Sequence, residues 1–145
     1  MARKDFSFFH TLRVRWAEAD MQGVVFNAHY LTFFDVGLTE YLRVLQERAG
    51  GDAGLTGDDL YVAHAELDYH ASARFDDVLD VGVRVERLGR TSMSFRIEIF
   101  RGEEHLISGQ LVYVFTGHAD GEDPRPMPVP DRFRELVAEF EAVAP

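Results

Sequence analysis

One carboxylate in this chain lies where it can act on a carbonyl group. Asp20 sits in a glycine-containing loop of mainly apolar residues, seven residues before Asn27, the expected first residue of a long helix. The free N–H groups and positive dipole end of a helix N-terminus polarise a carbonyl oxygen, and a nearby carboxylate can then attack the carbon or activate a water molecule. The alternative is that Asp20 caps a turn and Asn27 caps the helix. Spacing alone favours this structural alternative.

A second group of polar side chains has the types that bind metal ions. On a strand, His64, Glu66, Asp68 and His70 share one face. Two imidazoles and two carboxylates are ligands that zinc or iron accepts. Neighbours on a strand face are about 6.7 Å apart, which spreads these ligands too widely for one ion. The pattern therefore favours a polar sheet face, and no metal site is expected.

Residue types needed by several other chemistries are missing. The 145 residues include no cysteine, which excludes disulfides, thiolate metal sites and cysteine nucleophiles. Lys4 is the only lysine, so Schiff-base chemistry has no good candidate. No G-x-S-x-G motif is present, and the glycines of residues 50–59 lack the ending of a phosphate-binding loop. The formal charge of −10 argues against nucleic-acid binding.

A long helix over residues 27–48 is the element that would position Asn27. Its apolar side chains recur at spacings of three and four and form one stripe: Leu31, Phe34, Leu38, Leu42 and Leu45. Asn27 is a preferred N-cap type, and Gly50–Gly51 follow as a stop signal. Flanking aromatic residues widen the stripe, so we expect this helix to be buried over much of its circumference.

Alternating patterns predict a strand over residues 6–16 and four more at about 60–75, 78–88, 91–101 and 104–116. Short turns at Asp76–Asp77, Gly89–Arg90 and Gly102–Glu103 predict that the last four strands form an antiparallel meander. A loop at 117–130 and a short helix from Asp131 follow. The sequence therefore predicts an α+β fold, a five-stranded antiparallel sheet wrapped around one long central helix.

The chain length is typical of one domain, here residues 1–145. No run of 18 or more apolar residues occurs, so no membrane association is expected. The first residues have neither the apolar region nor the cleavage site of a signal peptide. We expect a cytoplasmic protein.

The segment from Trp16 to Arg43 carries a composite motif. Its residues are Asp20, Gly23, Val24, Val25, Phe26, Asn27, Tyr30, Phe33, Phe34 and Asp35, continuing through 39–43. This motif resembles the signature of hotdog-fold acyl-CoA thioesterases of the 4-hydroxybenzoyl-CoA thioesterase class, and the strand order fits over about residues 8–136. The resemblance implies a hotdog fold, hydrolysis of acyl-CoA thioesters and a homodimer or homotetramer. It also implies no metal and no cofactor, because coenzyme A is part of the substrate.

The resemblance further assigns roles to individual residues. Asp20 becomes the catalytic carboxylate, as nucleophile or general base, and Asn27 supplies the backbone N–H that polarises the carbonyl. The residues expected to bind substrate are Gly23, Trp16, Tyr30, Arg87, Arg90 and Ser92. The last three lie at one predicted hairpin, near which such thioesterases hold the phosphates and pantetheine of the coenzyme.

Some positions depart from the family pattern and leave the acyl preference open. Close relatives have His in place of Asn27 and Tyr in place of Trp16, and many have Arg in place of Leu38. Two other functions remain alternatives. A binding protein for a small apolar ligand would have little reason to place Asp20 at a helix start. A hotdog acyl-thioester dehydratase needs a histidine paired with an acid, and His29 is expected too deep in the helix, or facing away.

Overall fold

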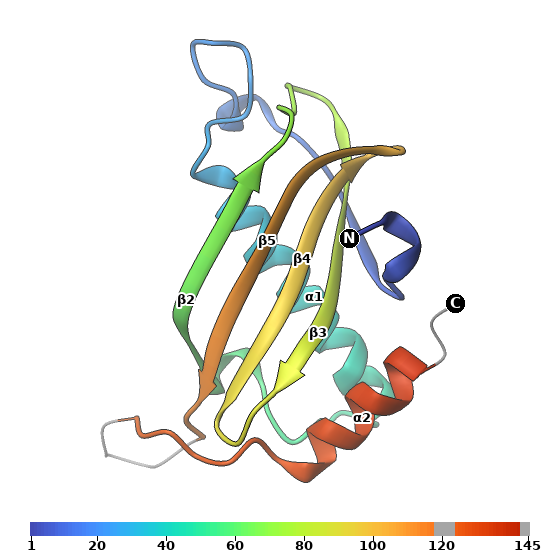
Figure 1. The fold of residues 1–145 in the computed structure, drawn as a ribbon, viewed down its shortest axis with the longest axis vertical. Coiled ribbons are helices and arrows are strands. Elements are labelled where there is room, and N and C mark those ends of the chain that lie inside the picture. The colour runs from blue at the N-terminus through green and yellow to red at the C-terminus, as the bar shows by residue number, and fades with distance from the viewer. Residues whose placement is uncertain (118–123, 143–145) are drawn as a thin grey trace.

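The sheet is a single antiparallel layer that curves around helix α1, as Figure 1 shows. The computed structural model describes residues 1–117 and 124–142. The strands are β1 (Phe9–Arg13), β2 (Leu60–Tyr69), β3 (Val78–Leu88), β4 (Ser92–Arg101) and β5 (Glu104–Phe115), in the spatial order β1-β3-β4-β5-β2. The helices are α1 (His29–Arg48) and α2 (Asp131–Ala142), with short 3₁₀ turns η1 (Arg3–Asp5), η2 (Trp16–Glu18) and η3 (Gly57–Asp59). The predicted sheet wrapped around one long helix is confirmed.

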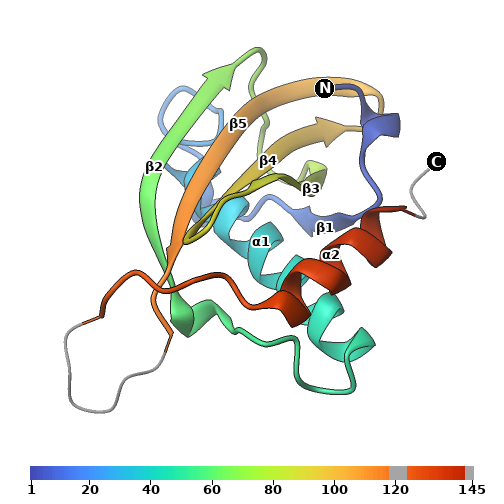
Figure 2. The ribbon, with the colours of Figure 1, turned by 60° about the horizontal axis from the view of Figure 1, so that its bottom comes forward.

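Helix α1 packs its apolar stripe onto the concave face of the sheet (Figure 2). Phe34 and Leu45 are fully buried there. Gly109 of β5 permits the close approach, because a Cβ at this position would lie 2.4 Å from Cε2 of Phe34. Leu31, predicted to belong to the stripe, is 42% exposed, and that part of the prediction is wrong. The periodicity predicts that Leu31 lies on the apolar stripe, but no described element covers that side of the helix.

The two central hairpins are confirmed, whereas the connection between β2 and β3 is not a hairpin. Gly89–Arg90 joins β3 to β4, and Gly102–Glu103 joins β4 to β5. Strand β2 instead pairs with β5, and β3 pairs with β1. The segment around Asp76–Asp77 therefore carries the chain from one edge of the sheet to the other side. A short turn indicates a change of direction but does not determine which strand becomes the neighbour.

Two predicted strands are longer than the observed ones. The strand predicted over 6–16 is limited to Phe9–Arg13, because Trp16–Glu18 folds into η2 and leads the chain away from the sheet. The strand predicted over 60–75 ends at Tyr69, where the N–H groups of His70 and Ala71 both bond to the carbonyl of Leu106. Both shortened strands end beside the loop that carries Asp20.

Helix α2 lies across the end of α1 that is remote from Asp20 (Figure 2). It buries the apolar residues predicted for it: Phe133, Leu136, Val137 and Phe140. Phe140 packs edge-on against Tyr41 of α1, with 5.7 Å between ring centroids. Of the loop predicted at 117–130, residues 118–123 lie outside the described part of the chain. Neither described helix is long and apolar enough to cross a membrane.

Candidate active site

Asp20 begins a small loop that its own backbone closes. The Asp20 N–H donates to the carbonyl of Val24 at 2.9 Å, and the Gly23 N–H donates to the carbonyl of Asp20 at 3.0 Å. Asp20 Oδ1 accepts the N–H of Gln22 at 2.8 Å, and no other described residue bonds this carboxylate. Gly23 adopts a φ of 79°, which glycine tolerates without strain. The loop thus holds the Asp20 carboxylate by one oxygen and leaves the other available.

Three further hydrogen bonds fix this loop to the rest of the fold. The Val25 N–H donates to the carbonyl of Ala73 at 2.8 Å, and the Phe26 N–H donates to the carbonyl of Glu18 at 2.9 Å. The Arg74 guanidinium reaches the carbonyl of Gly23 at 3.5 Å. The second of these bonds matters most for the site, since Phe26 directly precedes Asn27.

Helix α1 begins two residues later than predicted, and Asn27 does not cap it with its side chain. Ala28 is the N-cap, and His29 is the first helical residue. The carbonyl of Asn27 accepts the Tyr30 N–H at 3.4 Å and the Tyr69 hydroxyl at 3.2 Å, so Asn27 and Ala28 form a turn into the helix. No hydrogen bond between described residues uses the N–H groups of Asn27 and Ala28. Two donors therefore remain free at the positive end of α1.

The predicted aromatic contacts of the substrate lie in different environments. Trp16 is 80% exposed and rests edge-on against Phe75, with 5.4 Å between ring centroids. Tyr30 is only 2% exposed, and its hydroxyl accepts the N–H of Ala73 at 3.0 Å. Burial raises the pKa of Tyr30. Trp16 is accessible to a ligand in this chain, whereas Tyr30 supports the segment to which the Asp20 loop is attached.

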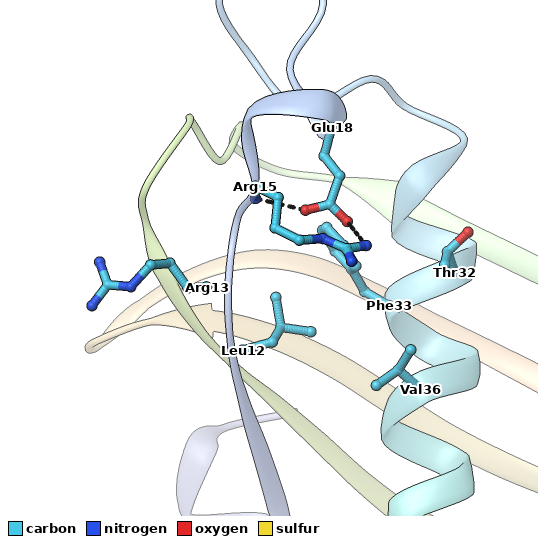
Figure 3. Close-up of a pocket in the computed structure, with 7 residues that line it drawn as sticks. All are labelled: Leu12, Arg13, Arg15, Glu18, Thr32, Phe33 and Val36. Carbon is cyan, nitrogen blue, oxygen red and sulfur yellow. Dashed lines mark hydrogen bonds and ion pairs between the residues drawn. The ribbon is translucent and has the colours of Figure 1, made fainter.

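A pocket of about 250 Å³ opens between β1, η2 and the first turns of α1, as Figure 3 shows. We call it the α1–β1 pocket; its lining residues are Leu12, Arg13, Arg15, Glu18, Thr32, Phe33 and Val36. Leu12 and Val36 face each other across it, and the Arg15–Glu18 pair lies at one end (Figure 3). The volume exceeds the ~150 Å³ of an apolar cavity that holds benzene.

Glu18 is a buried site residue that the sequence did not reveal. It is 5% exposed and accepts both the backbone N–H of Arg15 at 2.7 Å and its guanidinium at 2.8 Å. Burial alone would raise the pKa of Glu18, but the bonds from Arg15 and the charge of nearby His29 lower it. The available signal was an acidic residue three positions after the start of a turn, directly before the Asp20 loop.

The predicted coenzyme residues do not meet Asp20 within one chain. Arg87 and Arg90 are exposed at the β3–β4 hairpin, and Ser92 begins β4 beside them. The Asp20 loop lies at the opposite end of the sheet, where β3 starts (Figure 1). The length of β3 separates the two groups by roughly 30 Å.

The polar residues of β2 do not form a metal site. His64 lies 3.9 Å from Glu66, while the imidazole of His70 bonds to the hydroxyl of Ser108 at 2.8 Å. No cluster of three or more potential metal ligands occurs among the described residues. His64, Glu66 and Asp68 lie on the exposed edge strand β2, and His70 follows its end.

Comparison with known families identifies this arrangement. The model of the thioesterase superfamily matches residues 22–108, more than half of the chain. The chain belongs to the thioesterase superfamily. The resemblance drawn from the Asp20 motif is thereby confirmed. Curated relatives of this thioesterase include the acyl-CoA thioester hydrolase YbgC of Escherichia coli O157:H7, 28% identical over 137 residues, which are 89% of this chain and 92% of that protein. The acyl-CoA thioesterase YbgC of Haemophilus influenzae is 32% identical over 100 residues, 67% of this chain and 71% of that protein.

Solved structures agree with the hotdog fold. A thioesterase from Thermus thermophilus, complexed with coenzyme A and Zn, has a TM-score of 0.78 and 26% identity, covering 95% of this chain and 96% of that chain. A mutant 4-hydroxybenzoyl CoA thioesterase complexed with 4-hydroxybenzoyl CoA has a TM-score of 0.75 and covers 90% of this chain and 97% of that one. At 19% identity, this second similarity concerns the fold alone.

Proposed function

We propose that this thioesterase hydrolyses acyl-CoA thioesters, with Asp20 as nucleophile or general base and the start of α1 polarising the thioester carbonyl. The observation that carries the proposal is a backbone hydrogen bond that joins the segment before Asp20 to the segment before Asn27. The bond between the Phe26 N–H and the Glu18 carbonyl brings the start of the Asp20 loop next to the free N–H groups of Asn27 and Ala28. The names of the YbgC relatives support acyl-CoA as the substrate class.

The chemistry follows from this placement. The thioester oxygen accepts a hydrogen bond from the Asn27 or Ala28 N–H, and the helix dipole stabilises the negative charge that develops there. The free oxygen of Asp20 then either attacks the carbonyl carbon or removes a proton from an attacking water molecule. The coenzyme leaves as a thiolate that takes up a proton, and the acid is released directly or after hydrolysis of an anhydride.

Replacement of Asp20 by Asn tests the proposal. The Asn side chain can still accept the Gln22 N–H, so the loop geometry should survive while the charge and basicity are lost. We expect kcat to fall at least about a hundredfold. Asp52→Asn is the matched control, because Asp52 accepts the N–H of Gly54 at 2.9 Å in the same local turn, away from the site. Hydrolysis by Asp20→Asn at the parent rate would reject Asp20 as the catalytic group, whereas absence of hydrolysis in the parent itself would favour a ligand-binding protein.

Two further readouts separate the chemical alternatives. In a single turnover in ¹⁸O-water, direct attack of water on the thioester labels only the product acid. Label enters the Asp20 carboxylate only if an anhydride forms and water attacks its Asp20 carbonyl carbon. His29 lies at the helix start near Glu18, so the dehydratase alternative is tested as well. Formation of an enoyl thioester from a 3-hydroxyacyl-CoA, lost in His29→Ala, would replace hydrolysis by dehydration.

The proposal includes a homodimer formed through β2. This edge strand is ten residues long, and all of it except Leu60 and Leu67 is exposed. Long exposed edge strands favour pairing with a second chain. Antiparallel pairing of two copies about Ala65 would place His64 opposite Glu66 of the second copy and Tyr61 opposite its Tyr69, and such opposite-charge and aromatic pairs stabilise a sheet. The two-fold operation would also bring the β3–β4 hairpin of the second copy toward the Asp20 end, where Arg87 and Arg90 could hold the coenzyme's phosphates.

Size-exclusion chromatography with light scattering should therefore give at least twice the chain mass of 16.5 kDa. Glu66→Lys places a cation opposite His64 and should weaken the dimer and raise KM for acyl-CoA, because the second copy's arginines are lost. The double variant His64→Glu, Glu66→Lys restores opposite charges and should recover both properties. A fully active monomer would contradict the shared site.

A further inference from the structure

Glu18 is the one buried carboxylate beside the catalytic loop in the described part of the chain. The other buried polar or charged residues of that part are Asp59, Glu98, Ser108 and Thr116, which lie on β4, on β5 or next to the ends of β2 and β5. An ionised carboxylate is removed from water only where specific partners compensate it. The partners of Glu18 therefore indicate what it holds in place.

The carboxylate of Glu18 closes the η2 turn by binding one residue twice. One oxygen accepts the Arg15 backbone N–H at 2.7 Å, and the other accepts the Arg15 guanidinium at 2.8 Å. The Glu18 N–H in turn donates to the Arg15 carbonyl at 3.0 Å. These bonds fix the direction in which the chain enters the Asp20 loop, since Asp20 is only two residues further on.

The backbone carbonyl of Glu18 fixes the exit of the same loop. It accepts the N–H of Phe26 at 2.9 Å, and Phe26 precedes Asn27. A single residue thus determines both the start of the Asp20 loop and the approach to the free N–H groups of α1. Any rotation of the η2 turn moves the Asp20 carboxylate relative to these donors.

We infer that Glu18 is the positioning residue of the catalytic carboxylate: its ion pair with Arg15 sets the spacing between Asp20 and the Asn27 N–H, and it acts on the reaction only through Asp20. This inference rests on the proposed function of Asp20. Loss of the Glu18 side chain leaves the Arg15 N–H without its acceptor and releases the turn. A displacement of about 1 Å at a catalytic group can lower the rate about 10²-fold.

The test compares Glu18→Ala and Glu18→Gln with a control substitution at Asp59, which has the same role in another 3₁₀ turn. Asp59 is equally buried and closes η3 in the same way, accepting the Thr56 N–H at 2.8 Å, while its carbonyl accepts the Thr116 N–H at 2.9 Å. It lies at the far end of β2 from the Asp20 loop. Asp59→Asn should lower stability and leave kcat per folded molecule unchanged. Folded fractions are measured for every variant by near-UV circular dichroism at the assay temperature.

For Glu18→Ala we expect kcat per folded molecule to fall about 10²-fold with little change in KM. Glu18→Gln retains an oxygen that can accept the Arg15 N–H, so its kcat should lie between those of Glu18→Ala and the parent. In an Asp20→Asn background, Glu18→Ala should cause no further loss, because a positioning residue has nothing left to position.

Each other outcome overturns the inference. If Glu18→Ala lowers stability alone, as Asp59→Asn does, Glu18 is structural. If Glu18→Ala lowers kcat equally in the Asp20→Asn background, it acts independently of Asp20. Should Glu18→Ala not fold, Glu18→Gln in both backgrounds decides between the same results. Failure of the proposed function is recognised separately, because Asp20→Asn would then retain the parent activity.

Discussion

Replacing Tyr30 by Phe tests whether the hydroxyl of this buried tyrosine supports the Asp20 loop. The hydroxyl accepts the N–H of Ala73 at 3.0 Å, and the carbonyl of Ala73 accepts the N–H of Val25 at the end of the loop. Tyr30→Phe leaves the Ala73 N–H buried without an acceptor, which costs about 1–3 kcal/mol. For a chain of this length the entropy of unfolding is about 0.3 kcal/mol/K, so the melting temperature should fall by about 3–10 °C.

Thermal and urea unfolding at one fixed protein concentration measure this loss. Tyr69→Phe is the control, because it removes an exposed hydroxyl that bonds to the Asn27 carbonyl at 3.2 Å, and its effect should stay within about 0.5 kcal/mol. KM for acyl-CoA should change little in Tyr30→Phe, since the hydroxyl is occupied inside the fold. Unchanged stability together with a raised KM would refute this reasoning and make Tyr30 a substrate contact.

Two further substitutions probe the packing of the fold at Glu141 and at Gly109. Burial raises the pKa of Glu141, whose carboxylate accepts the Val85 N–H at 3.0 Å. The stability that protonated Glu141 contributes is therefore complete below the usual pKa of glutamate, and it is lost as the pH rises through the raised pKa. Glu141→Gln should therefore be at least as stable as the parent at neutral pH and no more stable than the parent in acid. Urea unfolding that shows Glu141→Gln to be less stable than the parent at neutral pH would contradict this. Gly109→Ala should cost about 1–3 kcal/mol because its Cβ would meet Phe34, whereas Gly57→Ala, with open space around it, should have almost no effect; equal urea midpoints for these two variants would contradict the packing.

The sequence predicted those elements whose ends are determined locally. Strand β3 has the predicted bounds, Val78–Leu88, because turn residues precede and follow it directly. The pairing of β2 could not be predicted in this way, since it depends on β5, which follows two hairpins later. A turn at Asp76–Asp77 is compatible both with a β2–β3 hairpin and with the observed pairing of β2 to β5. Local propensity also misplaced the helix start, where the Asn27 carbonyl, rather than its side chain, accepts the available donors.

The candidate site was predictable only in part for a related reason. The motif around Asp20 identified the loop, because its glycine and apolar residues form a recognisable local pattern. Glu18 was missed because burial of a charge depends on folding of the surrounding chain, and its partner Arg15 is recognisable only once η2 has formed. The distance between Asp20 and Arg87 or Arg90 depends on the whole length of β3, which no short motif records.

The strand order also determines when the site can form during synthesis. Strand β1 and the Asp20 loop emerge from the ribosome before the segments that hold them, since β1 pairs with β3 and Val25 bonds to Ala73. Strands β3, β4 and β5 are neighbours in both sequence and space, and such local pairing is fast. A nascent chain that ends before β3 therefore carries both Asp20 and Asn27 but lacks β3, the strand with which β1 pairs. Hydrolytic activity should appear only after the C-terminal half has been made, although every residue assigned to the chemical step lies in the first fifth of the chain.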